Sequence, residues 1–134
     1  MIHVVIAEPH AILRQRICRL CSDTHDVAVA AETSAPEELL REAHRTAPNA
    51  IVMSLVMTAG FDFALLRELK GQFPTVPVII LSLYRDDLYA MRAMESGASG
   101  FLMMEGVKDQ LIETVRMFVL GGPLAVGPAH FAAI

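Results

Sequence analysis

Five short apolar runs recur at regular intervals along the chain, and this pattern restricts the possible folds more than any other feature. The runs cover residues 4–7, 27–31, 51–53, 78–81 and 101–104. Each is a continuous apolar stretch instead of an alternation of apolar and polar residues, which is typical of parallel strands covered on both faces. The runs are therefore predicted to be the strands of a parallel sheet.

The segments between the runs have helical spacing. Residues 34–37 (Ser-Ala-Pro-Glu) have the form of a capping box with a proline in the first turn, so the second helix is expected to begin there. Gly97 is expected to end the fourth helix, because only glycine takes the left-handed conformation without penalty, and residues 121–123 (Gly-Gly-Pro) to end the fifth. The predicted apolar faces, helix by helix, are Leu13, Ile17, Leu20 and Cys21; Leu39, Leu40 and Ala43; Leu65, Leu66, Leu69 and Phe73; Leu88, Met91 and Met94; and Leu111, Ile112, Val115, Phe118 and Val119.

Strand and helix thus alternate five times with short connections, which places the chain in the α/β class. Right-handed crossovers leave few arrangements of parallel strands, and at this length the common one is a doubly wound five-stranded sheet of order 2-1-3-4-5 with helices on both faces. We expect this domain to cover residues 1–122. Residues 123–134 have no periodicity and are interpreted as a C-terminal tail or the start of a linker.

Composition and charge argue against two classes of partner. The 134 residues are 54% hydrophobic and 19% charged, enough apolar material for one sizeable core. The formal net charge is −4, whereas a duplex-binding protein usually presents a basic face to the phosphates, so no direct contact with nucleic acid is expected. The N-terminus lacks a basic segment followed by a long apolar core, and no apolar stretch is long enough to span a bilayer. We therefore expect a soluble cytoplasmic protein without membrane attachment.

The candidate functional residues are those that follow the predicted strands, because ligands of open parallel sheets bind just beyond the carboxyl ends. These residues are Glu8 and Pro9, Ser54, Ser82, and Met104 with Glu105. Few of them are charged. This edge of the sheet therefore looks like a reaction site that lacks most of its reactive groups.

Several segments, taken in order, resemble the receiver domain of two-component response regulators. They are residues 2–8, 51–57, 78–82, 95–101 (Glu-Ser-Gly-Ala-Ser-Gly-Phe) and the pair 121–122 (Gly-Gly). The resemblance covers residues 1 to about 122 and is greatest to the NarL, FixJ and LuxR-type branch, whose receivers precede a helix-turn-helix. It implies a flavodoxin-like (CheY-like) fold and a part in signal transduction that regulates transcription.

The resemblance also implies a phosphoryl switch. In this family an acidic pair after the first strand and an aspartate ending the third hold Mg²⁺, and the aspartate accepts the phosphate. A serine or threonine ending the fourth strand and a lysine ending the fifth bind the phosphoryl oxygens. Matched position by position, the resemblance places Glu8 and Pro9 at the acidic pair, Ser54 at the acceptor, Ser82 at the switch hydroxyl, Phe101 at the switch aromatic and Met104 at the lysine.

The chemistry of these substitutions can be argued from the residues themselves. One carboxylate, the Ser54 hydroxyl and the Val56 carbonyl are a poor donor set for Mg²⁺, which demands near-octahedral oxygen ligation. A serine cannot form an acyl phosphate, and its hydroxyl is a weak nucleophile unless a base adjoins it, for which Glu8 is the only candidate. A lysine in place of Met104 would be an uncompensated, partly buried charge once the carboxylates are lost. The sequence therefore indicates a repacked site with weak or absent Mg²⁺ binding, no cofactor and no enzymatic activity.

The expected function is that of a degenerate receiver that works without phosphorylation. It would bind a protein partner or a second copy of itself, and so control a DNA-binding output that is missing or lies on a separate chain. The resemblance implies dimerisation through the first and fifth helices, or through the fourth helix, fifth strand and fifth helix. The alternative function is a sensor whose emptied pocket takes an uncharged metabolite against Met104, Ser54 and Pro9. A flavin-binding flavodoxin is disfavoured because residues 8–10 lack the donors that a phosphate loop needs.

The remaining reactive side chains give weaker signals. Cys18 and Cys21 have the spacing of a redox or metal pair, but no second pair completes a zinc site, so they are interpreted as reduced thiols. The methionines are interpreted as core residues. The five histidines, His3, His10, His25, His44 and His130, are expected on the surface or in loops, with His10 at the border of the candidate site.

Overall fold

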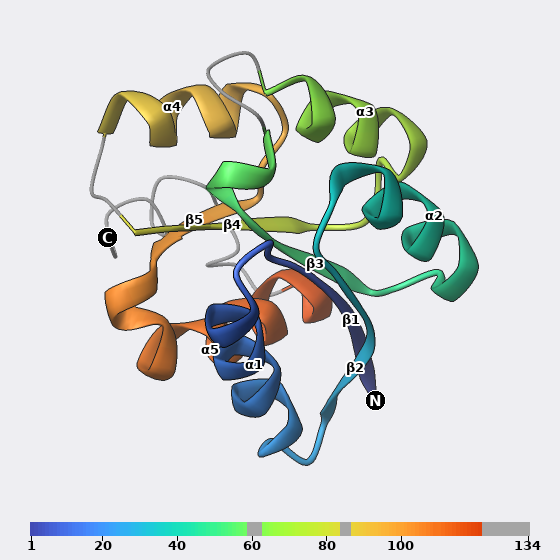
Figure 1. The fold of residues 1–134 in the computed structure, drawn as a ribbon, viewed down its shortest axis with the longest axis vertical. Helices are drawn as coiled ribbons and strands as arrows, with labels where there is room; N and C mark the ends of the chain where they lie inside the picture. The colour runs from blue at the N-terminus through green and yellow to red at the C-terminus, as the bar shows by residue number, and fades with distance from the viewer. Residues whose placement is uncertain (59–62, 84–86, 122–134) are drawn as a thin grey trace.

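Five parallel strands form one sheet with helices on both faces in the part of the chain that the structure describes, residues 1–58, 63–83 and 87–121 of a computed structural model (Figure 1). The strands are β1 (Ile2–Ala7), β2 (Val27–Thr33), β3 (Ala50–Ser54), β4 (Val78–Ser82) and β5 (Gly100–Met103). The helices are α1 (Ala11–Ser22), α2 (Pro36–Thr46), α3 (Ala64–Gln72), α4 (Asp87–Glu95) and α5 (Val107–Leu120), with short 3-10 turns η1 (Leu55–Thr58) and η2 (Met104–Gly106). The strand order is β2-β1-β3-β4-β5, which confirms the predicted class and topology. The predicted tail lies outside the described residues.

Alternate residues of the central strands enter two cores, one on each side of the sheet. Val5, Ile51 and Ile80 share a core with α2, α3 and α4, whereas Val52 and Ile79 share the other core with α1 and α5. Because both faces are buried, both sets of side chains must be apolar. This explains the continuous apolar runs of the sequence.

The predicted ends of the elements lie within about two residues of the observed ones. Gly97 (φ +115°) and Gly121 (φ +71°) take positive φ after α4 and α5, as predicted. The predicted capping box is wrong by one residue, because Ala35 is the N-cap of α2 and both the backbone N–H and the hydroxyl of Ser34 donate to Glu38 Oε1 at 3.0 Å. The last strand ends at Met103 instead of Met104, which begins η2.

The predicted core face of α4 holds for Met94, which packs against the core, but was wrong for Leu88 and Met91. Ala90 and Ala93 are fully buried, whereas the side chains of Leu88 and Met91 are 57% and 53% exposed. Both sets have helical spacing, but small alanines let the helix approach the sheet closely, so they form the inner face and the larger residues lie outside. Met91 is therefore not a core residue. An apolar surface remains on α4 after the core is filled.

Gly97 lies where an L-residue would be strained. Its φ is +115°, and a Cβ atom there would lie 2.6 Å from Lys70 Cγ. Lys70 is held in place because its Nζ donates to the carbonyl oxygen of Val76 at 2.7 Å. Gly97→Ala is expected to lower the free energy of unfolding by about 2 kcal/mol, measured by urea denaturation. Gly71→Ala is the matched control, since a Cβ atom there meets nothing within 4 Å, and equal stability of both variants would contradict the prediction.

An ion pair joins α5 to the start of β2. Arg116 Nε and Nη2 each donate to a carboxylate oxygen of Asp26 at 2.8 Å, and these hydrogen bonds hold the pKa of Asp26 below its usual value. A carboxyl whose pKa is lower in the folded state stabilises the fold above the usual aspartate pKa of about 4 and loses that contribution as pH falls through the folded-state pKa. Asp26→Asn is therefore expected to be less stable than the wild type at pH 7, with a difference that shrinks in acid. Thermal melts across that pH range test this, and a difference independent of pH would contradict it.

The two cysteines are free thiols. Burial, with a smaller contribution from Glu32, raises the pKa of Cys18 to about 12, and burial raises that of Cys21 to about 11. Both are therefore protonated at neutral pH, where a thiolate would be needed for reactivity or metal binding. Among the described residues, no three histidine, cysteine or acidic side chains are grouped so as to hold a metal ion.

Candidate functional site

Glu8 directly follows β1 and carries a buried carboxylate. Its side chain is 2% exposed, and its Oε2 accepts a hydrogen bond of 2.8 Å from the backbone N–H of His10. Arg14, on the first turns of α1, donates to the backbone carbonyl of Glu8 at 2.8 Å and pairs with the carboxylate of Glu32 at 3.5 Å. The guanidinium therefore fixes the β1–α1 turn without neutralising the Glu8 side chain.

Ser54 is the last residue of β3, and the turn η1 begins at the next residue. It lies in register with Leu81 of β4, and its side chain is 7% exposed. Its hydroxyl makes no hydrogen bond to Glu8 or to His10. Two residues later Val56 is 62% exposed, so the chain leaves the sheet with an apolar side chain directed to solvent.

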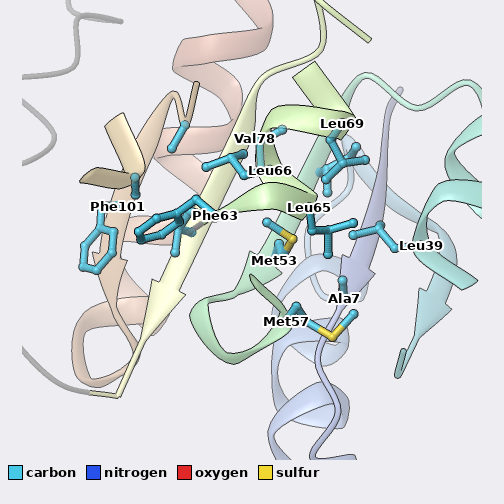
Figure 2. Packing of buried hydrophobic residues seen from close by; sticks show 14 of the residues in the cluster. Ala7, Leu39, Met53, Met57, Phe63, Leu65, Leu66, Leu69, Val78 and Phe101 are labelled. Atoms are coloured by element: carbon cyan, nitrogen blue, oxygen red, sulfur yellow. The ribbon is translucent and has the colours of Figure 1, made fainter. Parts of the chain in front are cut away.

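Ser82 and Phe101 occupy the positions that the sequence predicted for them. Ser82 ends β4 in register with Met103 of β5. Phe101 is fully buried in the core formed with α3 and α4, where Figure 2 shows its ring on β5 with Phe63 as a second aromatic of the same cluster. The aromatic position is therefore packed inward.

Met104 begins η2 directly after β5, and its side chain packs into a core. It is 4% exposed and belongs to the core between the sheet and α5, with Leu102, Val107 and Leu111. It does not line the cavity described below. Its thioether packs into the adjacent apolar core, and the expected contact between a small ligand and Met104 stays a prediction.

A cavity of about 410 Å³ lies at the carboxyl end of the sheet. Its walls come from the ends of β1, β3 and β4 and from α1, and almost all of their surface is apolar. The lining residues are Glu8, Pro9, His10, Leu13, Ser54, Leu55, Val56, Leu81, Ser82 and Leu83. The structure thus brings together Glu8, Pro9, Ser54 and Ser82, and places His10 at the border, as expected.

Sequence reasoning missed the apolar walls of this cavity. Leu55, Val56 and Leu83 come one or two residues after the ends of their strands, and Leu13 was assigned to the core face of its helix. No polar or charged residue marked these positions. A signal was present in the apolar dipeptide after Ser54 and the leucine after Ser82, where hydrophilic turn residues are usual.

Within the described residues, none of the helices is both long and apolar enough to cross a membrane.

Comparison with known proteins gives concordant matches. A family model described as the response regulator receiver domain matches residues 4–116. The transcriptional regulatory protein DegU of Brevibacillus brevis is 29% identical over 121 residues, which make up 90% of this chain and 51% of DegU. The chain thus spans about half the length of the curated relatives it matches.

Solved structures match over nearly the whole chain. A LuxR-family two-component response regulator from Aurantimonas sp. SI85-9A1 has a TM-score of 0.83 at 22% identity, and the match covers 98% of this chain and 96% of that one. The non-phosphorylated receiver domain of the stress response regulator RcsB from Escherichia coli has a TM-score of 0.81 at 19% identity, with 90% and 94% covered. At these identities the likeness is one of fold.

Proposed function

The chain belongs to the response regulator receiver domain family, and from this membership we propose that it is an atypical receiver of two-component signalling that works without phosphorylation. The observation that carries the proposal is Ser54 at the end of β3, beside a cavity to which Glu8 contributes the one acidic side chain among the lining residues. The likeness to DegU and to a LuxR-family regulator supports the NarL and LuxR-type branch.

The residues at the site do not fit Mg²⁺. The second acidic position is Pro9, the acceptor position is Ser54, and the cavity walls are apolar. Mg²⁺ needs several oxygen ligands in near-octahedral geometry and gives up its waters reluctantly. We therefore expect weak or absent Mg²⁺ binding, and no chemical step is assigned to the ion.

Phosphoryl transfer to Ser54 is equally disfavoured. A serine hydroxyl needs an adjoining base to act as a nucleophile, and Ser54 makes no hydrogen bond to Glu8 or His10. This chain therefore has no enzymatic role in the proposal.

Incubation with acetyl phosphate and MgCl₂, followed by intact-protein mass spectrometry, tests the proposal. The expected result is an unmodified mass under conditions that label a receiver with an aspartate acceptor. A phosphorylated species that Ser54→Ala abolishes would overturn the proposal. A phosphorylated species that Ser54→Ala leaves unchanged would overturn it as well, by moving the acceptor elsewhere.

In the proposal, the output of the domain is an interaction with protein. The exposed apolar side chains on α4, Leu88 and Met91, favour a second copy of the chain bound through α4, β5 and α5. Ile12 on α1 is also exposed and would serve the other arrangement, through α1 and α5. DNA binding would belong to a separate output module, as the longer relatives and the acidic net charge suggest.

A charge on the interface is expected to dissociate such a dimer. The double variant Leu88→Glu with Met91→Glu should raise the dimer dissociation constant by about 100-fold or more, because two buried carboxylates would face their symmetry mates. Analytical ultracentrifugation measures this. Ile12→Glu is the matched control, and dissociation by Ile12→Glu alone would assign the interface to α1 and α5.

Small-molecule sensing is the second candidate function, and the observation that favours it is the cavity of about 410 Å³ at the sheet end. Its size lies in the range of ligand pockets, and apolar walls with a few polar groups are typical of them.

A further inference from the structure

Glu8 is an unusual residue for an apolar cavity. Its side chain is 2% exposed, yet the carboxylate accepts one hydrogen bond, from the backbone N–H of His10 to Oε2. Among the described residues, its Oε1 has no hydrogen bond and no lysine, arginine or histidine nitrogen lies within 4.0 Å of either oxygen. The Oε1 atom is not sealed off from solvent and faces the cavity, where water or a ligand can donate to it.

The arginine nearest in the chain does not supply the missing partner. Arg14 donates to the backbone carbonyl of Glu8 at 2.8 Å and lies 3.5 Å from the carboxylate of Glu32. It is thus held by other acceptors in the same turn. The carboxylate of Glu8 remains directed into the cavity that it lines.

The rest of the cavity restricts what could pair with Glu8. Leu13, Leu55, Val56 and Leu83 form apolar walls, and their side chains offer no ligand to a metal ion. An anion would be repelled by Glu8, and a neutral donor would hydrogen-bond to the carboxylate without balancing its charge. A protonated amine with an apolar body meets each condition, since the ammonium donates to Oε1 and the body contacts the leucine and valine side chains.

We infer that the cavity binds a small organic cation, an ammonium compound with an apolar body, with Glu8 as its counter-ion. The inference deepens the proposed sensing function and replaces the uncharged metabolite with a charged class. It also rests on the proposal that Mg²⁺ does not occupy this end of the sheet. The ligand would connect the ends of β1, β3 and β4, which are the segments that line the cavity.

Titration of the ¹⁵N-labelled protein with benzylamine, followed by amide NMR, tests the inference. Benzyl alcohol is the neutral isostere and sodium benzoate the anionic one. We expect benzylamine to shift the amides of Glu8, Ser54 and Leu83, with binding at least about tenfold tighter than that of benzyl alcohol. Equal binding of the two compounds, or no shift with benzylamine, would overturn the inference without any need for a variant.

Two variants locate the charge. Glu8→Gln keeps the side-chain size and an oxygen that accepts from His10, and it should weaken benzylamine about tenfold while leaving benzyl alcohol unchanged. Glu95→Gln, at the exposed end of α4, is the matched control and should change neither. Undiminished benzylamine binding by Glu8→Gln would overturn the assignment of Glu8.

A parallel titration with MgCl₂ separates this inference from the proposed function. Shifts at Glu8 and Ser54 with millimolar Mg²⁺ would contradict the proposed function. If neither Mg²⁺ nor benzylamine shifted the amide signals, the ligand assignment alone would be contradicted.

Discussion

Replacing Met104 with lysine is expected to lower the free energy of unfolding by about 3–5 kcal/mol, because an ammonium would enter a core that holds no partner for it. Met104 is 4% exposed and packs with Leu102, Val107 and Leu111. The effect should appear in urea denaturation at pH 7 as a shift of the midpoint without a change of slope.

Two further variants make this prediction specific to charge. Met104→Leu nearly conserves volume and should cost less than about 1.5 kcal/mol. Adding Ser54→Asp to Met104→Lys should recover about 1 kcal/mol or more beyond additivity, since the acid and base would follow strands that flank β4. Equal stability of the lysine and leucine variants would contradict the prediction.

The second large effect is expected at Phe101. Its ring is fully buried with Phe63 in the core beside α3 and α4, so Phe101→Ala should lower the free energy of unfolding by about 3–5 kcal/mol. Phe101→Tyr tests the inward position separately. A hydroxyl without a partner in this core should cost about 1–3 kcal/mol.

Urea denaturation of the three proteins measures both effects. If Phe101→Tyr were as stable as the wild type, the ring edge would have to reach water or an acceptor, and the inward packing of the aromatic would be contradicted.

Fold class and topology could be predicted from the sequence because two independent patterns agreed. Continuous apolar runs identified strands buried on both faces, and helical spacing between them required crossover connections. The inner face of α4 could not be predicted in this way. Ala90 and Ala93 have the same spacing as the larger Leu88 and Met91, so the choice depended on how closely the helix packs against the sheet.

The candidate site was predictable where position in the fold determines it. Glu8 follows β1, and Ser54 and Ser82 end β3 and β4, so the parallel topology brings them to one edge. The placement of Met104 was not predictable, because its side chain could fill either the cavity at the end of the sheet or the core beside α5. The roles of these residues remain predictions.

The distribution of these positions over separate elements has a consequence for any attempt to install a metal-dependent switch at this edge of the sheet. Pro9, Ser54 and Met104 follow or end three different strands, and the third is sealed in a core. Acidic residues introduced alone at positions 9 and 54 would face an apolar cavity. A lysine introduced alone at position 104 would lie among leucine side chains. Each single substitution would therefore lower the stability of the fold, so such a switch would have to be installed by several changes together.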